Sequence, residues 1–153
     1  MKFFVRLLCT VGFASAVPAA PLPYDTASDA HVALQQGLAD AQGQSTDVLV
    51  IFGANWCEDC RDLDKAMRGL SASLIDSRYV VVKIDVGNFD KNLDLAKRYG
   101  NPIQKGIPAA VVLTPGDQVL YSTKAGELAN ARRMGDRNIC DFLSKVLPTH
   151  EPP

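Results

Sequence analysis

The chain has 153 residues, of which 47% are hydrophobic and 22% are charged. This composition is typical of one globular domain, and the length is too short for two domains of ordinary size. Sixteen basic residues against 17 acidic ones give a net charge of −1. No excess of positive charge is available to bind a phosphate backbone, so we expect no nucleic-acid partner. Disordered and collagen-like classes are excluded as well.

Residues 1–19 have the layout of a secretory signal peptide. Lys2 and Arg6 precede an apolar run at 7–17, and small residues follow it. The run is roughly half as long as the ~20 residues that a membrane-spanning helix needs. Cleavage is predicted after Ala19 or, alternatively, after Ala16, and an uncleaved N-terminal anchor is the other interpretation. The sequence therefore predicts an exported protein, either periplasmic or secreted.

Alternating strand and helix patterns follow the leader. Residues 18–27 are rich in Pro and Ala and predict a loosely held lead-in. A helix is predicted from an N-cap at Ser28 to about Gly43. The elements expected after it are a strand at 48–52, a helix from Cys57 to about Leu70, a strand at 79–86, a helix at 90–99, strands at 109–114 and 118–124, and a closing helix at about 139–147. This order predicts a mixed sheet that is covered by helices on both faces.

The strand at 48–52 is a continuous apolar run, which is typical of a strand buried on both faces. After a short turn the pattern becomes helical. One face of that helix carries Cys60, Leu63, Met67 and Leu70. The change from strand to helix thus falls on a pair of cysteines.

Cys57 and Cys60 are separated by two residues at the start of this helix. The unpaired backbone N–H groups of a helix N-terminus stabilise a thiolate, and two cysteines at this spacing can close a small-ring disulfide. We therefore predict a reversible redox pair, with Cys57 as the exposed nucleophile and Cys60 as the buried resolving thiol. Cys9 would leave with the leader, and the remaining odd number of cysteines does not fit a framework of structural disulfides.

Two other uses of this spacing are weaker. A zinc site needs two further ligands, and the candidates Cys140, His31 and His150 are isolated from one another in the sequence. An inert disulfide would close only a very short loop, in which a cross-link stabilises the fold least. We expect no metal and no organic cofactor, the redox group being the Cys57–Cys60 disulfide itself.

In three segments the sequence resembles the thioredoxin superfamily, specifically its exported thiol-disulfide interchange proteins. The segments are the strand at 48–52 leading into Ala54-Asn55-Trp56-Cys57-Glu58-Asp59-Cys60, the strand at 80–85, and Gly106-Ile107-Pro108. The resemblance implies an α/β thioredoxin-like fold with a central mixed sheet flanked by helices. The domains would be a signal peptide at 1–19, an N-terminal helical extension at 20–45, the thioredoxin-like domain at 46–148 and a tail at 149–153.

The resemblance also implies roles for three residues around the dithiol. Pro108 matches a cis-proline that faces the cysteines, although an ordinary proline at a strand entry is usually trans. The backbone of Ile107 would pair with a bound substrate strand. Trp56 matches a tryptophan that shields the sulfurs, while simple core packing is the alternative for a lone tryptophan.

The chain departs from the thioredoxin pattern at the buried acid. That acid lies six residues before the first cysteine, where this chain has Ile51. Lys83 matches the lysine that accompanies the acid, so it should lie near the dithiol without its usual partner unless Glu58 or Asp59 serves instead. These two acids should oppose the Cys57 thiolate by about 1 kcal/mol each. We therefore predict a weakly perturbed Cys57 and a reducing or intermediate potential.

Other candidate residues have simpler interpretations. Cys140, between two apolar residues of the closing helix, is expected in the core. His31 and His150 are expected at the surface. Arg132, Arg133 and Arg137 are expected to form a solvated face, with a docking patch for a partner as the alternative.

The residues and the resemblance together predict a monomeric thiol-disulfide oxidoreductase that favours reduction and acts on disulfides or thiols of exported proteins. Its oxidised dithiol would need an electron donor, for which a membrane-bound thiol relay is the expected partner. The alternatives are an oxidase or isomerase, or a redox-inert binding module that keeps the same fold. Fold analogy alone does not choose among them.

Overall fold

The structure is a computed structural model and describes residues 21–146. The expected leader and the end of the tail, with His150, lie outside these residues. The elements in chain order are α1 (Ala30–Gln44), β1 (Asp47–Gly53), α2 (Glu58–Arg68), α3 (Ala72–Asp76), β2 (Tyr79–Asp85), α4 (Leu93–Arg98), the 3₁₀ helix η1 (Pro102–Lys105), β3 (Ala109–Leu113), β4 (Val119–Ser122) and α5 (Ala131–Val146).

The strands form one mixed sheet in the order β2-β1-β3-β4. β1 pairs in parallel with β2, from Asp47 opposite Tyr79 to Gly53 opposite Asp85. It pairs in antiparallel fashion with β3, and β3 pairs in the same way with β4. All seven residues of β1 are buried, which accounts for the unbroken apolar run in its sequence.

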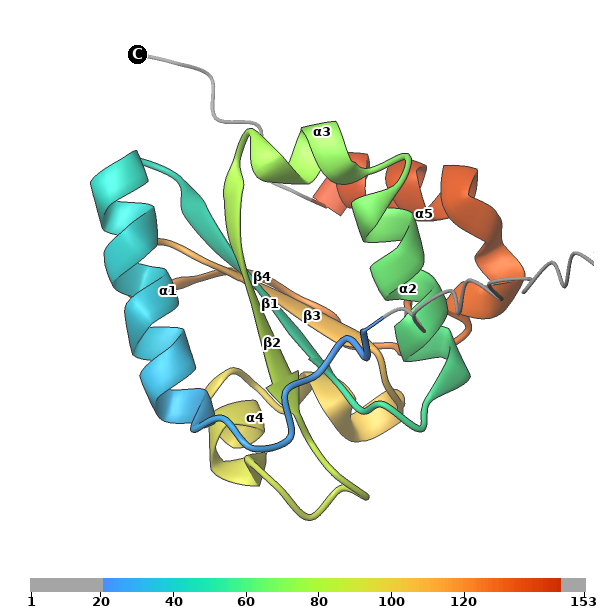
Figure 1. The fold of residues 1–153 in the computed structure, drawn as a ribbon, viewed down its shortest axis with the longest axis horizontal. Helices are drawn as coiled ribbons and strands as arrows, with labels where there is room; N and C mark the ends of the chain where they lie inside the picture. Colours follow the sequence, from blue (N-terminus) through green and yellow to red (C-terminus); the bar gives the residue numbers. More distant parts are fainter. Residues whose placement is uncertain (1–20, 147–153) are drawn as a thin grey trace, which may run out of the picture.

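Helices cover both sides of this sheet. α1 lies on one side of the strands, and α2, α3 and α5 lie on the other, with α4 at the lower end of the strands in Figure 1. The core between these layers includes the fully buried Phe52 of β1 and Leu63 of α2. The C-terminal end of β1 is therefore a fixed point from which the chain enters α2.

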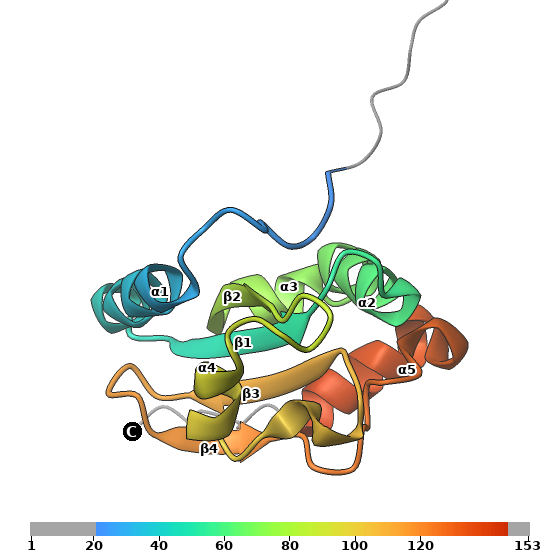
Figure 2. The same cartoon turned by 90° about the horizontal axis from the view of Figure 1, so that it is seen from below.

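The segment before α1 is part of the packed structure. It runs from beside α2 to the start of α1 along the β2 edge of the sheet (Figures 1 and 2). Tyr24 in this segment is buried within the hydrophobic core. The prediction of a loosely held lead-in is therefore wrong for this part of it, because one aromatic ring anchors the segment.

The closing helix begins earlier than predicted, since α5 starts at Ala131 and is interrupted at Gly135 instead of starting near Ile139. The other differences from the predicted elements are local. Leu70 is exposed, since α2 ends at Arg68 and the chain turns at Gly69 before the helical pattern reaches that residue. α3 and η1 were not predicted, because elements of one turn are too short to show a periodic pattern. The N-cap of α1 is Asp29, one residue after the predicted Ser28.

Candidate active site

The two cysteines lie where β1 leads into α2, with Cys57 as the N-cap of the helix. The backbone N–H of Cys60 donates to Cys57 Sγ over 3.2 Å. The Cys57 thiol in turn donates to the carbonyl oxygen of Ile107, with 3.6 Å between sulfur and oxygen. Both cysteines are free thiols, so the structure represents the reduced dithiol.

Cys57 is more enclosed than the sequence suggested. Cys57 is 6% exposed and Cys60 is 1% exposed. The prediction of an exposed Cys57 is wrong, because the first turn of α2 and the Ile107 carbonyl group cover its sulfur. Cys57 nevertheless lines a groove of about 450 Å³, whereas Cys60 packs into the core as predicted.

The two thiols have opposite pKa shifts. Hydrogen bonds from the side chain and the backbone of Cys60 lower the pKa of Cys57 to about 7, against the opposing effects of burial and of the Asp59 carboxylate. Donation to Cys57, together with burial, raises the pKa of Cys60 far above its usual range. Cys57 is therefore the more acidic of the two thiols and the one that forms a thiolate near neutral pH. The prediction of a weakly perturbed Cys57 is wrong, since it considered the nearby acids and omitted the Cys60 thiol.

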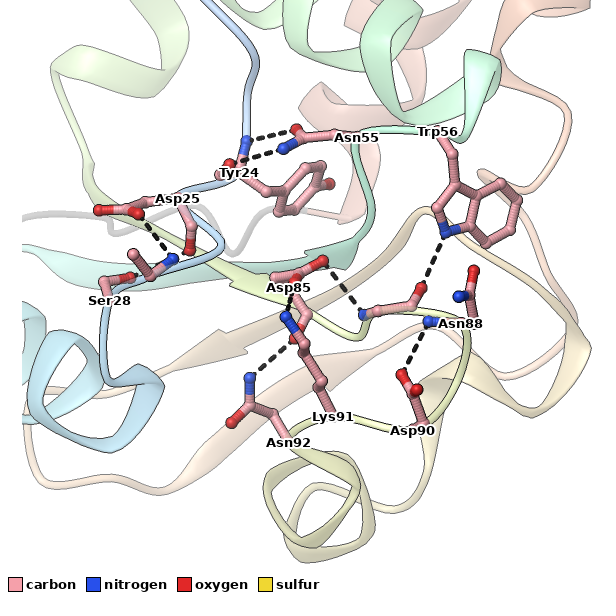
Figure 3. Close-up of polar contacts among 12 residues, drawn as sticks. Tyr24, Asp25, Ser28, Asn55, Trp56, Asp85, Asn88, Asp90, Lys91 and Asn92 are labelled. Carbon is pink, nitrogen blue, oxygen red and sulfur yellow. Dashed lines mark hydrogen bonds and ion pairs between the residues drawn. The ribbon is translucent and has the colours of Figure 1, made fainter.

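Aromatic side chains form one wall of the groove. Trp56 is 55% exposed, and its Nε1–H donates to the carbonyl oxygen of Gly87 over 2.9 Å (Figure 3). Its ring meets that of Phe89 edge to face at 6.3 Å between centroids. Core packing is therefore excluded for Trp56, which instead presents an open apolar surface beside Cys57.

The segment before β3 forms part of the groove on another side. The peptide bond between Ile107 and Pro108 is cis, as the resemblance implies. Ile107 lines the groove together with Cys57 and Trp56. Through its carbonyl group, this segment touches the reactive sulfur directly.

The acids between the cysteines are bound to the start of α5. Arg132 forms ion pairs with both Glu58 and Asp59, and its backbone N–H donates to Asp59 Oδ1 over 3.0 Å. Arg132 is therefore not part of a merely solvated face, and the prediction fails for it because the fold brings α5 against α2. The positive charge also offsets the two carboxylates beside Cys57.

Lys83 has an acidic partner that the sequence analysis missed. Its ammonium group forms an ion pair with Asp64, which also accepts from Arg68 at 2.5 Å. Asp64 is buried and lies one helical turn after Cys60 on the inner face of α2. Neither Glu58 nor Asp59 serves as the partner of Lys83, because both point towards Arg132.

Tyr24 is a further residue at the site that sequence reasoning missed. Its backbone N–H donates to Asn55 Oδ1 over 2.9 Å, and Asn55 Nδ2 donates back to the Tyr24 carbonyl oxygen over 2.8 Å (Figure 3). The phenol packs against Gly53, where a Cβ atom would overlap the ring hydroxyl and lie 2.8 Å from Cys60 Sγ. The available signal was Gly53 itself, since a glycine that ends a buried strand often marks a close approach.

The remaining candidates do not line the groove beside Cys57. Cys140 is half-buried rather than in the core, because the buried residues of that part of α5 are Ile139 and Leu143. His31 is exposed and its Nε2 lies 2.9 Å from Asp94 Oδ2. The other two arginines of the predicted solvated face, Arg133 and Arg137, are exposed.

Within residues 21–146, no three His, Cys, Asp or Glu side chains are grouped as metal ligands would be. None of the helices in this part of the chain is long and apolar enough to cross a membrane.

Comparison with known proteins identifies the family. A family model described as thioredoxin-like matches residues 29–115. The solved structure of a disulphide isomerase from Xylella fastidiosa Temecula1 is 50% identical in sequence and has a TM-score of 0.81, covering 85% of this chain and 100% of that chain. A thioredoxin from Thermus thermophilus has a TM-score of 0.51 at 23% identity, covering 72% of this chain and 78% of that chain, and shares the fold alone. No curated protein matches the chain. The chain belongs to the thioredoxin-like family.

Proposed function

We propose that this protein is a thiol-disulfide oxidoreductase that reduces disulfides of exported proteins. One observation carries the proposal: the two thiols have opposite pKa shifts, and the more acidic one lines an open groove. A thiolate is the nucleophile of disulfide exchange. An inert structural pair would need neither the acidic thiol nor the groove.

The proposed reaction has two exchange steps. The Cys57 thiolate attacks one sulfur of the substrate disulfide, which breaks that disulfide, forms a mixed disulfide and releases the first substrate thiolate. Cys60 then loses its proton and attacks Cys57 Sγ, which forms the Cys57–Cys60 disulfide and releases the second substrate thiol. Two electrons pass from the dithiol to the substrate. An external dithiol, for which we propose a membrane-bound thiol relay, would return them.

The groove suits a polypeptide substrate of loosely defined sequence. Trp56 and Phe89 offer apolar contact, while the main chain at Ile107 offers polar groups beside the sulfur. Main-chain pairing tolerates many substrate sequences. Export rests on the predicted leader at 1–19, and mass spectrometry of the processed protein should find Ala20 as its first residue.

Reduction is the favoured direction because of the Cys57 pKa. A pKa of about 7 lies close to the ~7 of thioredoxin and far above the ~3.5 of a strong oxidant. The negative charge of Asp59 acts in the same sense, since it raises the pKa of Cys57. A thiolate that is only moderately stabilised gives a less oxidising disulfide.

A second candidate function is disulfide isomerisation. The observation that favours it is the 50% identity to a protein named a disulphide isomerase. The match covers the whole of that protein's solved chain. An isomerase needs Cys57 to attack and leave again, so it should retain activity when Cys60 is replaced. Recovery of activity from scrambled ribonuclease by Cys60→Ser, which keeps a side-chain donor to Cys57, separates the two candidates, since a reductase would lose its resolving thiol.

The test of direction is the reduction potential. The protein is equilibrated in glutathione buffers of known poise, and the dithiol is read by alkylation shift with Cys60→Ser as the control. A potential near or below ~−270 mV supports a reductase, whereas one above ~−150 mV supports an oxidase. Insulin reduction no faster than with dithiothreitol alone would instead indicate a redox-inert binding module.

A further inference from the structure

We propose that Tyr24 is a further active-site residue, whose phenol hydroxyl donates a hydrogen bond to Cys60 Sγ and stabilises the Cys60 thiolate whenever that sulfur attacks or leaves. The inference rests on the proposed function, in which Cys60 is the resolving thiol. It assigns part of the dithiol chemistry to a segment that precedes the region matched by the family model, which begins at residue 29.

Two contacts set the position of the phenol: one with Asn55 and one with Gly53. Asn55 lies two residues before Cys57, and its reciprocal pair of hydrogen bonds with Tyr24 fixes the main chain of Tyr24 beside the dithiol segment. Gly53 supplies the space, because any Cβ atom there would overlap the phenol oxygen and crowd Cys60 Sγ. The ring is 3% exposed, so water does not compete for the hydroxyl.

The chemistry of the two groups makes Tyr24 the donor. Burial, followed by the nearby thiol groups, raises the pKa of Tyr24 well above 10.0, so the phenol keeps its proton at neutral pH. Its hydrogen bond to Cys60 lowers the pKa of Cys60, in opposition to burial and to donation towards Cys57. The phenol thus favours the charged form of a sulfur that the protein otherwise keeps neutral.

The thiolate is needed in both directions of exchange. In the resolving step, Cys60–SH and the mixed disulfide on Cys57 give the intramolecular disulfide and a free substrate thiol, which takes up the proton that Cys60 loses. In the reverse direction an external thiolate attacks Cys57 Sγ, and Cys60 leaves as the thiolate. Tyr24 should therefore speed both directions equally and leave the equilibrium potential unchanged, since neither end state contains a charged Cys60.

The test uses Ellman's reagent, a disulfide that releases a coloured thiolate each time a protein thiol reacts with it or displaces it. The absorbance of this thiolate follows the modification of Cys57 and then the closure of the Cys57–Cys60 disulfide. Cys57 releases the first equivalent when it is modified, and Cys60 releases the second when it closes the disulfide. The chain carries Cys9→Ser and Cys140→Ser, so that these two steps are isolated. In Tyr24→Phe the second phase should slow by at least about tenfold, the effect of losing a hydrogen bond to an ionised group. The first phase should change by less than about twofold.

Tyr79→Phe is the matched control. Tyr79 is also buried and its hydroxyl has no hydrogen-bond partner among the described residues. It lies at the opposite end of β2 from the dithiol, paired with Asp47 while Gly53 pairs with Asp85. Removing this hydroxyl should leave both phases unchanged.

Three results would overturn the inference: a second phase in Tyr24→Phe within twofold of the parent, equal slowing in the Tyr79 control, or a parent protein without a second phase. Reduction of the preformed disulfide by glutathione should slow by the same factor in Tyr24→Phe, while its potential stays that of the parent. A changed potential would show that the substitution had altered the fold of the site. Because the reagent is a small molecule, these outcomes are independent of whether the protein reduces insulin.

Discussion

Replacement of Cys60 by alanine and by serine tests what makes Cys57 acidic. The largest cause of the lowered Cys57 pKa is the hydrogen bond from the Cys60 side chain. Alanine removes that donor but keeps the backbone N–H, which lies 3.2 Å from Cys57 Sγ. Serine keeps both donors in a side chain of similar size. The two variants therefore separate the side-chain hydrogen bond from the rest of the site.

The expected shift follows from the strength of the lost contact. A hydrogen bond to an ionised group contributes about 1.5–3 kcal/mol, which corresponds to roughly one to two pKa units. The pKa of Cys57 should rise from about 7 to between ~8 and ~9 in Cys60→Ala. At pH 7 the thiolate fraction would then fall from about one half to about 10% or less. In Cys60→Ser the pKa should stay within about half a unit of the parent value.

Thiolate absorbance at 240 nm, titrated against a Cys57→Ala blank, measures this directly. The rate of carbamidomethylation of Cys57 against pH gives an independent value. A Cys60→Ala protein whose Cys57 still titrates near pH 7 would refute the reasoning. Equal shifts in the alanine and serine variants would also refute it, because the side-chain donor would then have no separate effect.

Three further predictions concern stability. Gly53→Ala should cost about 1–3 kcal/mol in urea unfolding, because the added methyl group overlaps the phenol of Tyr24; an equal cost in a Tyr24→Ala background would exclude that contact as the cause. The reduced protein should gain stability as the pH rises from about 7 to 9, because the pKa of Cys57 in the folded protein lies below its ordinary value of 9.0. In that pH range the unfolded chain binds a proton at Cys57 that the folded protein has lost. Cys57→Ser should lack this gain in stability. Lys83→Met should cost about 1–3 kcal/mol in thermal unfolding, because it removes one of the two cations paired with buried Asp64, and an unchanged melting temperature would mean that Arg68 suffices.

Patterns that repeat over neighbouring residues allowed much of the fold to be predicted. The apolar run of β1, the helical stripe of α2 and the strand of β3 each occupy a short stretch of sequence, and the cysteines lie where the first of them leads into the second. Local periodicity of this kind reports which face of an element is buried. The sheet, the helix start and the position of the dithiol follow from it.

What surrounds the dithiol depends on contacts between distant residues. Tyr24 meets Asn55 across 31 positions, and Arg132 meets Asp59 across 73. No periodic pattern links such pairs, so the lead-in was predicted to be loose and Arg132 to be solvated. The enclosure of Cys57 was missed for the same reason, since the group that covers it belongs to the segment before β3.

The tight fit of Tyr24 against Gly53 has a consequence for sequences that share this fold. Position 53 can take a side chain only if position 24 changes as well, since that side chain would take the space of the phenol. Relatives that have a tyrosine about 30 residues before a Gly-Ala-Asn-Trp-Cys segment should share this arrangement. Those with a larger residue at the end of the first strand should have lost the tyrosine. Covariation of positions 24 and 53 would thus allow a subgroup of the family to be recognised from its sequences alone.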